Sequence, residues 1–358
     1  MGGVSEPFVP RVDISGWDSG DDAERQTIVR DVDKACRRVG FLQVVGHGID
    51  PNIINEMLTA ADEFFALPDA DKRMCVSPSA DINRGYAPMG SEALSYSVGV
   101  QTPPDLFEAF NLGLEPVPDD AAHQTRRHDL FVENIWPLPL PGWRLPLLRY
   151  FDEASNLARR LTRIFAVALD LPESFFVTKT DHSTVTMRVN NYVRQPGAPD
   201  PIDGQQRMGA HTDYGIVTVL YADRVAGLEI LTPDGTWHGV IPEPGALLVN
   251  LGDLLAEWTN DRWRSTLHRV VPPPRSTSGT ARRRSVAFFF DGNHDALVEC
   301  LPSCVSVENP AKYPPVLAGD HLMAKLLGPR TLTNSAATVN TAATRLAPSP
   351  PNSMTAHL

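Results

Sequence analysis

Hydrophobic residues in the first half of the chain recur mostly at the spacing of amphipathic helices. In residues 22–39, 54–65 and 147–168 the large apolar side chains lie three or four positions apart, which places them on one helical face. Asp50 followed by Pro51 is the cap and first-turn pair expected where the second of these helices begins. This half of the chain is therefore predicted to be mainly helical, with short strands at 8–15 and 40–45.

From Ser183 onward the pattern changes to the two-residue alternation of β-strands. In residues 184–192 the polar side chains dominate one face, and an inward polar face suits a barrel that contains a site. Further strand-like runs are separated by turn signals such as Pro233-Asp234-Gly235. Several short strands at close intervals indicate a barrel or a sandwich. The expected runs are 216–221, 228–231, 237–241, 246–251, 268–271 and 285–290.

The segments between these elements have their own signals. Residues 78–104 are rich in Gly, Ser and Pro, so they form either an ordinary surface loop or a wall that faces a substrate. Residues 116–141 are studded with proline and resemble a linker. A short helix capped by Asp253 is expected at 252–258. The final stretch, 331–358, consists of small and polar residues, and we expect it to be disordered.

Composition narrows the class of protein. The 358 residues are 42% hydrophobic, which is ample for a sizeable core in one or two domains. A formal net charge of −11 gives no basic field to attract a nucleic acid. No apolar run approaches the ~18 residues that span a bilayer, and the first residues carry no signal-peptide pattern. We expect neither a nucleic-acid nor a membrane partner; the oligomeric state cannot be read from the sequence.

The number and spacing of the cysteines indicate the redox environment of the protein. Cys36, Cys75, Cys300 and Cys304 are too few and too scattered for a secreted disulfide framework in a chain this long. The spacing of the last two lacks the second pair that a zinc knuckle needs. A reducing, cytoplasmic location is therefore expected.

The first candidate for chemistry is the triplet His211-Thr212-Asp213. Alternate side chains of a strand share a face, so His211 and Asp213 would project together. A neutral imidazole beside a carboxylate is two thirds of a facial iron(II) site, provided that a second histidine arrives from elsewhere. The triplet alone is common by chance. His268 is the candidate third ligand, because the intervening strand-like runs supply what a returning barrel strand needs.

A second candidate is the pair Arg283 and Ser285, two positions apart at the start of the last strand-like run. On a strand both point to the same side, while Arg284 points to the other. A guanidinium fork beside a hydroxyl is a fitting receptor for the far carboxylate of a dicarboxylic acid such as 2-oxoglutarate. The alternative is a solvated strand end.

These features together resemble the isopenicillin N synthase-like branch of the iron(II)/2-oxoglutarate-dependent dioxygenases. The resemblance covers roughly residues 7–328 and rests on many stretches in one order. It implies a mainly β fold with flanking helices, in which a double-stranded β-helix, or jelly-roll, core follows a helical N-terminal region. The stretches are 9–15, 40–49, 84–86, 209–215, 244–253 and 258–270.

The resemblance also implies a division of the chain. An N-terminal non-haem dioxygenase region is followed by a linking helical segment, the jelly-roll core that holds Fe(II) and 2-oxoglutarate, a C-terminal helical segment and a disordered tail. The expected ranges are 7–125, 126–182, 183–300, 301–328 and 329–358.

The site residues follow from the same resemblance. Two histidines and an aspartate are implied as ligands of Fe(II), and four residues as contacts of 2-oxoglutarate. The family commonly has proline directly after the tyrosine of this set, whereas here residues 193–195 intervene before Pro196. The implied metal ligands are His211, Asp213 and His268, and the implied co-substrate contacts are Arg283, Ser285, Asn190 and Tyr192.

The implied activity is hydroxylation, desaturation or cyclisation of a small-molecule metabolite with O2, which releases succinate and CO2. Ascorbate is an optional reductant. Relatives that take no 2-oxoglutarate keep the Arg-x-Ser pair, so an iron oxidase that draws its electrons from its substrate or from ascorbate is an alternative. A catalytically silent ligand-binding protein on the same barrel is another.

The substrate itself cannot be read from the sequence. A secondary metabolite, an amino-acid derivative and a sugar-like compound are equally compatible with it. Family position and residue type suggest a substrate wall made of Arg84, Tyr86, Phe110, Asn111 and Tyr214.

Overall fold

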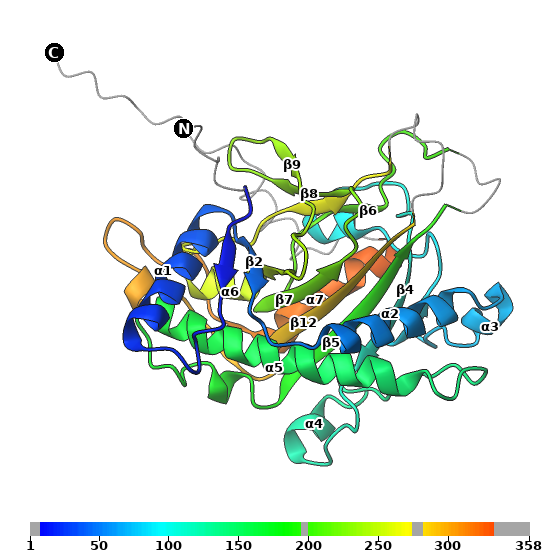
Figure 1. Cartoon of the computed structure of the whole chain (residues 1–358), viewed down its shortest axis with the longest axis horizontal. Coiled ribbons are helices and arrows are strands. Elements are labelled where there is room, and N and C mark those ends of the chain that lie inside the picture. The colour runs from blue at the N-terminus through cyan, green and yellow to red at the C-terminus, as the bar shows by residue number, and fades with distance from the viewer. Residues whose placement is uncertain (1–7, 195–199, 274–281, 333–358) are drawn as a thin grey trace.

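The computed structural model describes residues 8–194, 200–273 and 282–332. The disorder predicted for residues 331–358 concerns a stretch of which 333–358 lie outside this part of the chain. Two β-sheets form the centre of the molecule, and helices cover the outer face of the larger sheet (Figure 1). The mainly β fold with flanking helices and a jelly-roll core is thereby confirmed.

The larger sheet has eight strands in the order β1-β2-β10-β7-β12-β5-β4-β3. Its centre is antiparallel, and β12 pairs with β5 on one side and β7 on the other. The strands are β1 (Arg11–Asp13), β2 (Phe41–Val45), β3 (Gly85–Ala87), β4 (Glu108–Gly113), β5 (Ser183–Tyr192), β7 (Val217–Ala222), β10 (Leu247–Leu251) and β12 (Arg283–Asn293).

The smaller sheet has four strands in the order β6-β11-β8-β9. They are β6 (Met208–His211), β8 (Leu228–Leu231), β9 (Trp237–Gly239) and β11 (His268–Val270). A separate pair is formed by β13 (Leu297–Val298) and β14 (Val316–Leu317). All seven strand predictions of the second half are found, with ends shifted by at most a few residues.

The three long helices of the first half form as predicted. Asp21 and Glu24 close a capping box at the start of α1, and the Asp50 side chain accepts a hydrogen bond from the Asn52 amide at the start of α2. In Figure 1, α5 runs beside α1 and α2 across the outer face of the larger sheet. These helices are α1 (Asp22–Arg38), α2 (Pro51–Phe65) and α5 (Arg144–Ala168).

Shorter helices complete the fold. They are α3 (Asp69–Arg73), α4 (Ala121–Thr125), α6 (Asp253–Trp258), α7 (Ala318–Thr331) and the 3₁₀ turns η1 (Leu94–Val98), η2 (Val177–Lys179) and η3 (Pro302–Cys304). The expected end of the C-terminal helical segment at residue 328 is wrong, because α7 continues to Thr331 and stops where Leu332 adopts a left-handed conformation.

Strands β3 and β4 were not predicted. All six residues of β4 are buried, so no polar face alternates with its apolar one. The N-terminal region therefore supplies both edges of the larger sheet, with β1 and β2 at one edge and β3 and β4 at the other.

Alternation along β5 and β12 separates the core from the interior of the barrel. Met187 and Phe288 face outward into the core cluster that contains α5. Arg188 and Ala287, their neighbours along the two strands, line a cavity between the two sheets. The same cavity receives side chains from β6, β11 and α7.

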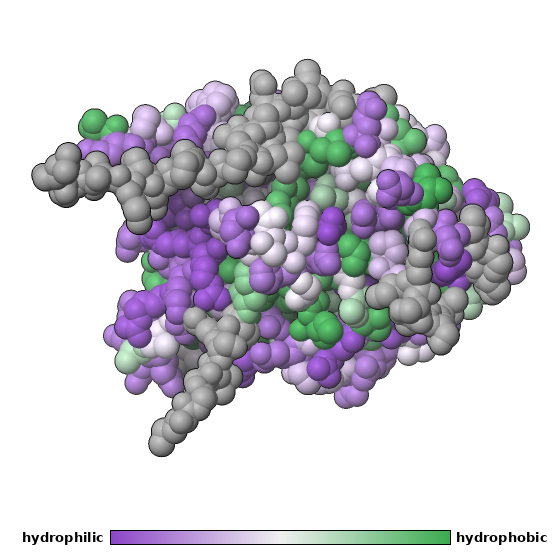
Figure 2. All heavy atoms as spheres, turned by 90° about the horizontal axis from the view of Figure 1, so that it is seen from above, coloured by the Kyte–Doolittle hydropathy of each residue, from purple (hydrophilic) through white to green (hydrophobic). Residues whose placement is uncertain are grey.

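The surface seen in Figure 2 shows apolar residues interspersed with polar ones, and a more continuous polar stretch at the left of this view. Among the described residues, every helix is too short or too polar to cross a membrane.

Candidate active site

His211, Asp213 and His268 meet at one end of the smaller sheet. His211 ends β6 and His268 opens β11, and the two lie opposite each other in the pairing of these strands. Asp213 Oδ1 is 3.8 Å from Nε2 of each histidine. One ligand atom from each residue lies within 4.8 Å of the others, and all three residues are buried. The structure thus brings the predicted triad together.

The reason given from the sequence for the proximity of His211 and Asp213 is only partly correct. Strand β6 ends at His211, so Asp213 does not share a strand face with it. The carbonyl of Asp213 instead accepts a hydrogen bond of 2.8 Å from the amide of Asp253, the first residue of α6. The loop after β6 is therefore held by the start of this helix.

Each ligand candidate has one polar atom held by the protein and another directed at the shared point. Nδ1 of His211 donates to the carbonyl of Gly209 at 2.8 Å, and Nδ1 of His268 donates to the carbonyl of Thr266 at 3.1 Å. Because a carbonyl can only accept, both Nε2 atoms keep a lone pair. This arrangement is typical of metal-binding histidines.

The carboxylate of Asp213 is oriented in the same way. Its Oδ2 accepts hydrogen bonds from Asn250 Nδ2 at 2.6 Å and from the Thr218 hydroxyl, which leaves Oδ1 to face the histidines. Burial, and then the neighbouring His268, lower the pKa of His211 to about 4, so its imidazole is neutral at pH 7. Two imidazoles and one carboxylate fit Fe(II) and leave positions for other ligands.

Asp253 connects the loops that carry the three candidates. Its carboxylate is fully buried and accepts hydrogen bonds from Thr212 at 3.1 Å and from Ser265 at 2.6 Å. Lys325 of α7 lies 3.2 Å away. The prediction that Asp253 caps α6 is wrong: Gly252 is the cap, and the Asp253 side chain is used for these contacts instead.

A second cluster lies on β5 and β12 of the larger sheet. Arg283 is 1% exposed, with its guanidinium 5.0 Å from the centre of the Tyr192 ring. Asn190 donates to the Ser285 hydroxyl at 3.3 Å, and that hydroxyl lies 3.5 Å from the Tyr192 oxygen. The four residues face one another across β5 and β12, where Arg283 pairs with Tyr192 and Ser285 with Asn190.

The Arg283 guanidinium has unmet hydrogen-bonding capacity. Within the part of the chain that the structure describes, its Nε and Nη1 have no hydrogen-bond partner. A buried cation left in this state is costly, so the arrangement fits an anion such as a carboxylate. Arg284 faces the other side and pairs with Asp223 and Asp62. Neither arginine belongs to a solvated strand end, because Arg283 is buried and Arg284 is held in ion pairs.

The residues expected in the substrate wall divide into two groups. Arg84 and Tyr214 line the cavity, although each guanidinium nitrogen of Arg84 already donates to a backbone carbonyl. Tyr86 and Phe110 do not line it, which corrects the expectation. They pair across β3 and β4 with their rings against Phe64 in the core, on the outer face of the sheet.

Asn111 is buried on β4 but is not among the residues that line the cavity. Several residues that do line it were not predicted. Asp291 of β12 is one, and burial, with a smaller effect of Asp213, raises its pKa to about 7. Glu92, Arg188 and Arg330 are further lining residues with ionic side chains.

Sequence signals for these residues differ. Arg188 shares the polar face of 184–192 with Asn190 and Tyr192, so strand alternation could have found it. Glu92 lies in an irregular segment, and Arg330 lies beyond the expected end of α7. Their positions depend on tertiary contacts alone.

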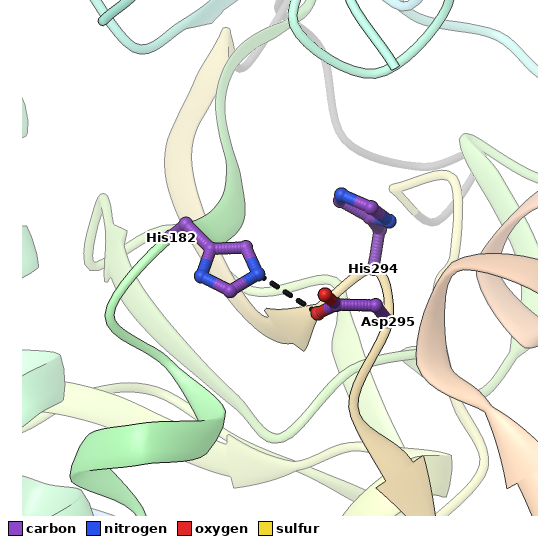
Figure 3. A group of neighbouring side chains, drawn as sticks. All are labelled: His182, His294 and Asp295. Carbon is purple, nitrogen blue, oxygen red and sulfur yellow. Dashed lines mark hydrogen bonds and ion pairs between the residues drawn. The ribbon is translucent and has the colours of Figure 1, made fainter. Parts of the chain in front are cut away.

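A second group with metal-ligating side chains lies outside the cavity, where β5 begins and β12 ends. Figure 3 shows His182, His294 and Asp295 at this place. His182 is bonded at both nitrogens, to Asp181 and Asp295 at 2.8 Å each, and His294 Nε2 donates to the carbonyl of Ala122 at 3.0 Å. These bonds link separate segments of the chain and account for the group without a metal. In the His211 triad, by contrast, the Nε2 atoms face a shared point.

Comparisons with known proteins agree with this geometry. Residues 9–139 match a family model described as the N-terminal region of non-haem dioxygenases in morphine synthesis, and residues 184–292 match the 2OG-Fe(II) oxygenase superfamily. The 2-oxoglutarate-Fe(II) type oxidoreductase hxnY of Emericella nidulans is 36% identical over 87% of each chain. Validamycin A dioxygenase of Streptomyces hygroscopicus subsp. limoneus is 32% identical over 88% of this chain and 85% of its own.

Solved structures show the same relationship. A full-length Neurospora crassa protein in complex with alpha-KG and thymine superimposes with a TM-score of 0.77 at 28% identity, covering 89% of this chain and 96% of that one. A putative 2OG-Fe(II) oxygenase family protein from Caulobacter crescentus gives a TM-score of 0.76 at 28% identity, over 89% of this chain and 98% of its own.

Proposed function

Because this chain belongs to the 2OG-Fe(II) oxygenase superfamily, we propose that His211, Asp213 and His268 hold the Fe(II) with which it oxidises a small-molecule substrate. The enzyme is a 2-oxoglutarate-dependent dioxygenase with Fe(II) as its cofactor and O2 as a reactant. Bound Fe(II) supplies the activation of O2 that couples substrate oxidation to the conversion of 2-oxoglutarate into succinate and CO2.

Arg283, Ser285 and Tyr192 bind the far carboxylate of 2-oxoglutarate in this proposal, and Asn190 orients the Ser285 hydroxyl. The unmet guanidinium atoms of Arg283 are the observation that carries this assignment. Ser285 and Phe289 are four residues apart on β12, about 13 Å at the backbone. Phe289 pairs with Thr218, whose hydroxyl binds Asp213. The carboxylate cluster thus lies at one end of β12, and Asp213 is linked through Thr218 to a point farther along it, so a 2-oxoglutarate extended along β12 points from one toward the other.

The remaining work of the protein is to orient the substrate and to exclude water. Leu94, Leu220 and Val270 add apolar surface to the cavity around the triad. Hydroxylation is the default outcome, whereas desaturation or cyclisation would need only a different pose of the substrate. Within the class of small metabolites, the ionic residues of the cavity favour a polar one.

Two alternatives are less well supported. An oxidase that takes electrons only from its substrate or from ascorbate is disfavoured by the named relatives, which are 2-oxoglutarate-Fe(II) oxidoreductases, whereas a buried Arg283 is compatible with both kinds of enzyme. A silent binding protein would have no need to hold the second polar atom of every triad member, as Gly209, Thr266 and Asn250 do.

The decisive experiment loads the protein with Fe(II), adds 2-oxoglutarate and O2, and measures succinate. We expect turnover to fall at least 100-fold in His211→Ala, since a metal ligand is lost. His182→Ala is the matched control, because it removes a histidine of the other cluster, and it should keep wild-type turnover. Oxygen uptake that ignores 2-oxoglutarate would instead support the oxidase, and the absence of both would support the binding protein.

We also propose a reducing, cytoplasmic setting. All four cysteines are free, and burial raises the pKa of the Cys36 thiol well above its usual value. A thiol of this kind is inert packing material and not a redox group.

A further inference from the structure

The cavity contains a buried ion pair, Arg188 and Glu92, whose polar atoms are only partly used by the protein. Arg188 Nη2 donates to Glu92 Oε2 at 2.7 Å, and Arg188 Nε donates to Asn190 at 3.1 Å. The guanidinium lies 4.9 Å from the centre of the Phe107 ring, which fixes its plane. Within the described residues, its Nη1 amino group has no hydrogen-bond partner.

Glu92 has a free acceptor beside this donor. Its Oε1 is 3.9 Å from Nε of Arg330, an ion pair too long for a hydrogen bond. Burial alone would raise the pKa of Glu92, but Arg188 and Arg330 outweigh it and lower the pKa, so the carboxylate is ionised at pH 7. Both residues line the cavity.

Arg330 cannot serve a ligand in the same way. Its Nη1 donates to the carbonyl of Ala80 at 3.2 Å and its Nη2 donates to the side chain of Asn83. It holds the end of α7 against the segment before β3 and adds positive charge near Glu92. The donor and the acceptor left for a ligand are therefore Arg188 Nη1 and Glu92 Oε1, which belong to the two partners of one ion pair with no net charge between their side chains.

We propose that Arg188 and Glu92 bind the lactam-type edge of a neutral heterocyclic substrate, in which a C=O and an N–H are adjacent. Arg188 donates to the carbonyl oxygen and Glu92 accepts the N–H, so one substrate edge satisfies both groups. This rests on the proposed function, since the bound ring must lie beside the metal ligands. Leu94, Leu326 and Phe289 offer apolar surface to the rest of the ring.

Other substrate classes fit this pair less well. A carboxylate would gain Arg188 but face the charge of Glu92, and like charges at close range in a buried site are strongly unfavourable. A hydrocarbon would displace water from both groups and leave them without partners. The pair therefore selects against both.

The test uses the full-length protein loaded with Fe(II) and 2-oxoglutarate and three sets of probes. The first contains 2-pyridone, uracil and hydantoin, the second benzoate and nicotinate, and the third toluene and benzene. Binding is measured without O2 as the ligand-induced rise in melting temperature and by calorimetry. We expect the first set to bind at least 10-fold more tightly than the other two.

Glu92→Gln is the diagnostic variant, and Glu108→Gln is its matched control. Glu108 is also buried and ion-paired, to Lys72 at 2.7 Å, but it lies on the outer face of the same sheet. Glu92→Gln removes the charge that repels anions, so we expect roughly 10- to 100-fold weaker lactam binding and stronger benzoate binding. Glu108→Gln should bind the three sets of probes with the same order of affinity as the wild type, even if its melting temperature is lower.

The outcomes separate the two proposals. Wild-type protein that prefers carboxylates or hydrocarbons, or that binds no probe, overturns the lactam inference, and so does a Glu92→Gln variant that behaves like Glu108→Gln. Slow succinate formation from 2-oxoglutarate without any probe tests the oxygenase itself. If that turnover is present while lactam binding is absent, only the further inference fails; if folded protein shows no turnover with any probe, the proposed function fails.

Discussion

Asn250 is the residue that most directly aims the proposed carboxylate ligand, because its amide donates to Asp213 Oδ2 from the facing strand β10. An outer contact of this kind orients a ligand and raises its affinity for metal. Asn250→Ala should therefore weaken Fe(II) binding about 10- to 100-fold while all three ligands remain. Titration with Co(II), followed by its visible absorption, measures the change. Affinity equal to that of the wild type would show that Thr218 alone suffices.

Arg283 and Arg284 form a natural pair of variants, since they are neighbours that face opposite sides of β12. Arg283→Ala should raise the dissociation constant of 2-oxoglutarate roughly 10- to 100-fold, because a charge-assisted contact is lost, and should leave metal affinity unchanged. Arg284→Ala breaks ion pairs with Asp223 and Asp62 and should leave 2-oxoglutarate binding unchanged. Calorimetric titration of both proteins decides the assignment. Equal effects of the two substitutions would contradict it.

Residues with a periodic or motif context were predictable, and residues without one were not. Strand alternation placed Arg283 and Ser285 on one face, and the triplet with a returning histidine identified the three ligand candidates. Glu92 has no such context, since it sits in an irregular segment and reaches the cavity only because η1 packs there. The family resemblance suggested that Phe110 lines the substrate site, but its position in the register of β4 places its side chain in the core.

At the scale of elements, α6 and α7 are coupled through the buried Asp253. Lys325→Met would leave the Asp253 charge, which is fully buried, without its ammonium partner. Breaking a buried pair in this way costs about 3–5 kcal/mol. Lys312→Met is the control, because Lys312 pairs with Asp261 at the surface and its loss should cost less than about 1 kcal/mol. Urea denaturation of both variants measures the difference, and equal losses would refute the coupling.

Lys325→Met should also affect the loops that carry the metal ligands. Asp253 binds Thr212, between His211 and Asp213, and Ser265, three positions before His268. A disturbed Asp253 would loosen both loops, so Lys325→Met should weaken Co(II) binding although no ligand is changed. Unaltered Co(II) affinity in folded Lys325→Met protein would show that α7 is only a cover.

Elements with strong periodicity were predicted well, and those dictated by pairing were not. The helical spacing of α1, α2 and α5 and the alternation of β5 and β12 are local properties. Strand β3 has three residues, and β4 is buried on both faces, so neither presents an alternating pattern. β4 forms by pairing with β5, and β3 by pairing with β4, and a local pattern does not encode either pairing.

At the scale of the whole molecule, the larger sheet joins the N-terminal region to the jelly-roll core. The family models match residues 9–139 and 184–292 separately, yet strands from the first region pair with β10 and β5 of the second. The domain division proposed from the sequence therefore marks regions of one folding unit. We expect a single unfolding transition, because removing either region would leave strand edges unpaired.

Tryptophan fluorescence and far-ultraviolet circular dichroism in urea test this expectation. Trp17 reports on the first region, Trp143 on the segment between the regions, and Trp258 and Trp263 on the second region, and all four are buried. Coincident transitions are expected from the two signals. A first transition in which part of the fluorescence change precedes the loss of β-structure would contradict a single folding unit.

The unmet guanidinium of Arg283 also links the lifetime of this protein to metabolism. A ligand that binds only the folded chain stabilises it by about 2.7 kcal/mol at a concentration 100 times its dissociation constant. 2-Oxoglutarate would act as the missing counter-ion, so a protease should degrade the protein more slowly when this metabolite is added, and the protection should vanish in Arg283→Ala. In a cell, the abundance of the enzyme would then follow the supply of a central carbon intermediate, without any dedicated regulator.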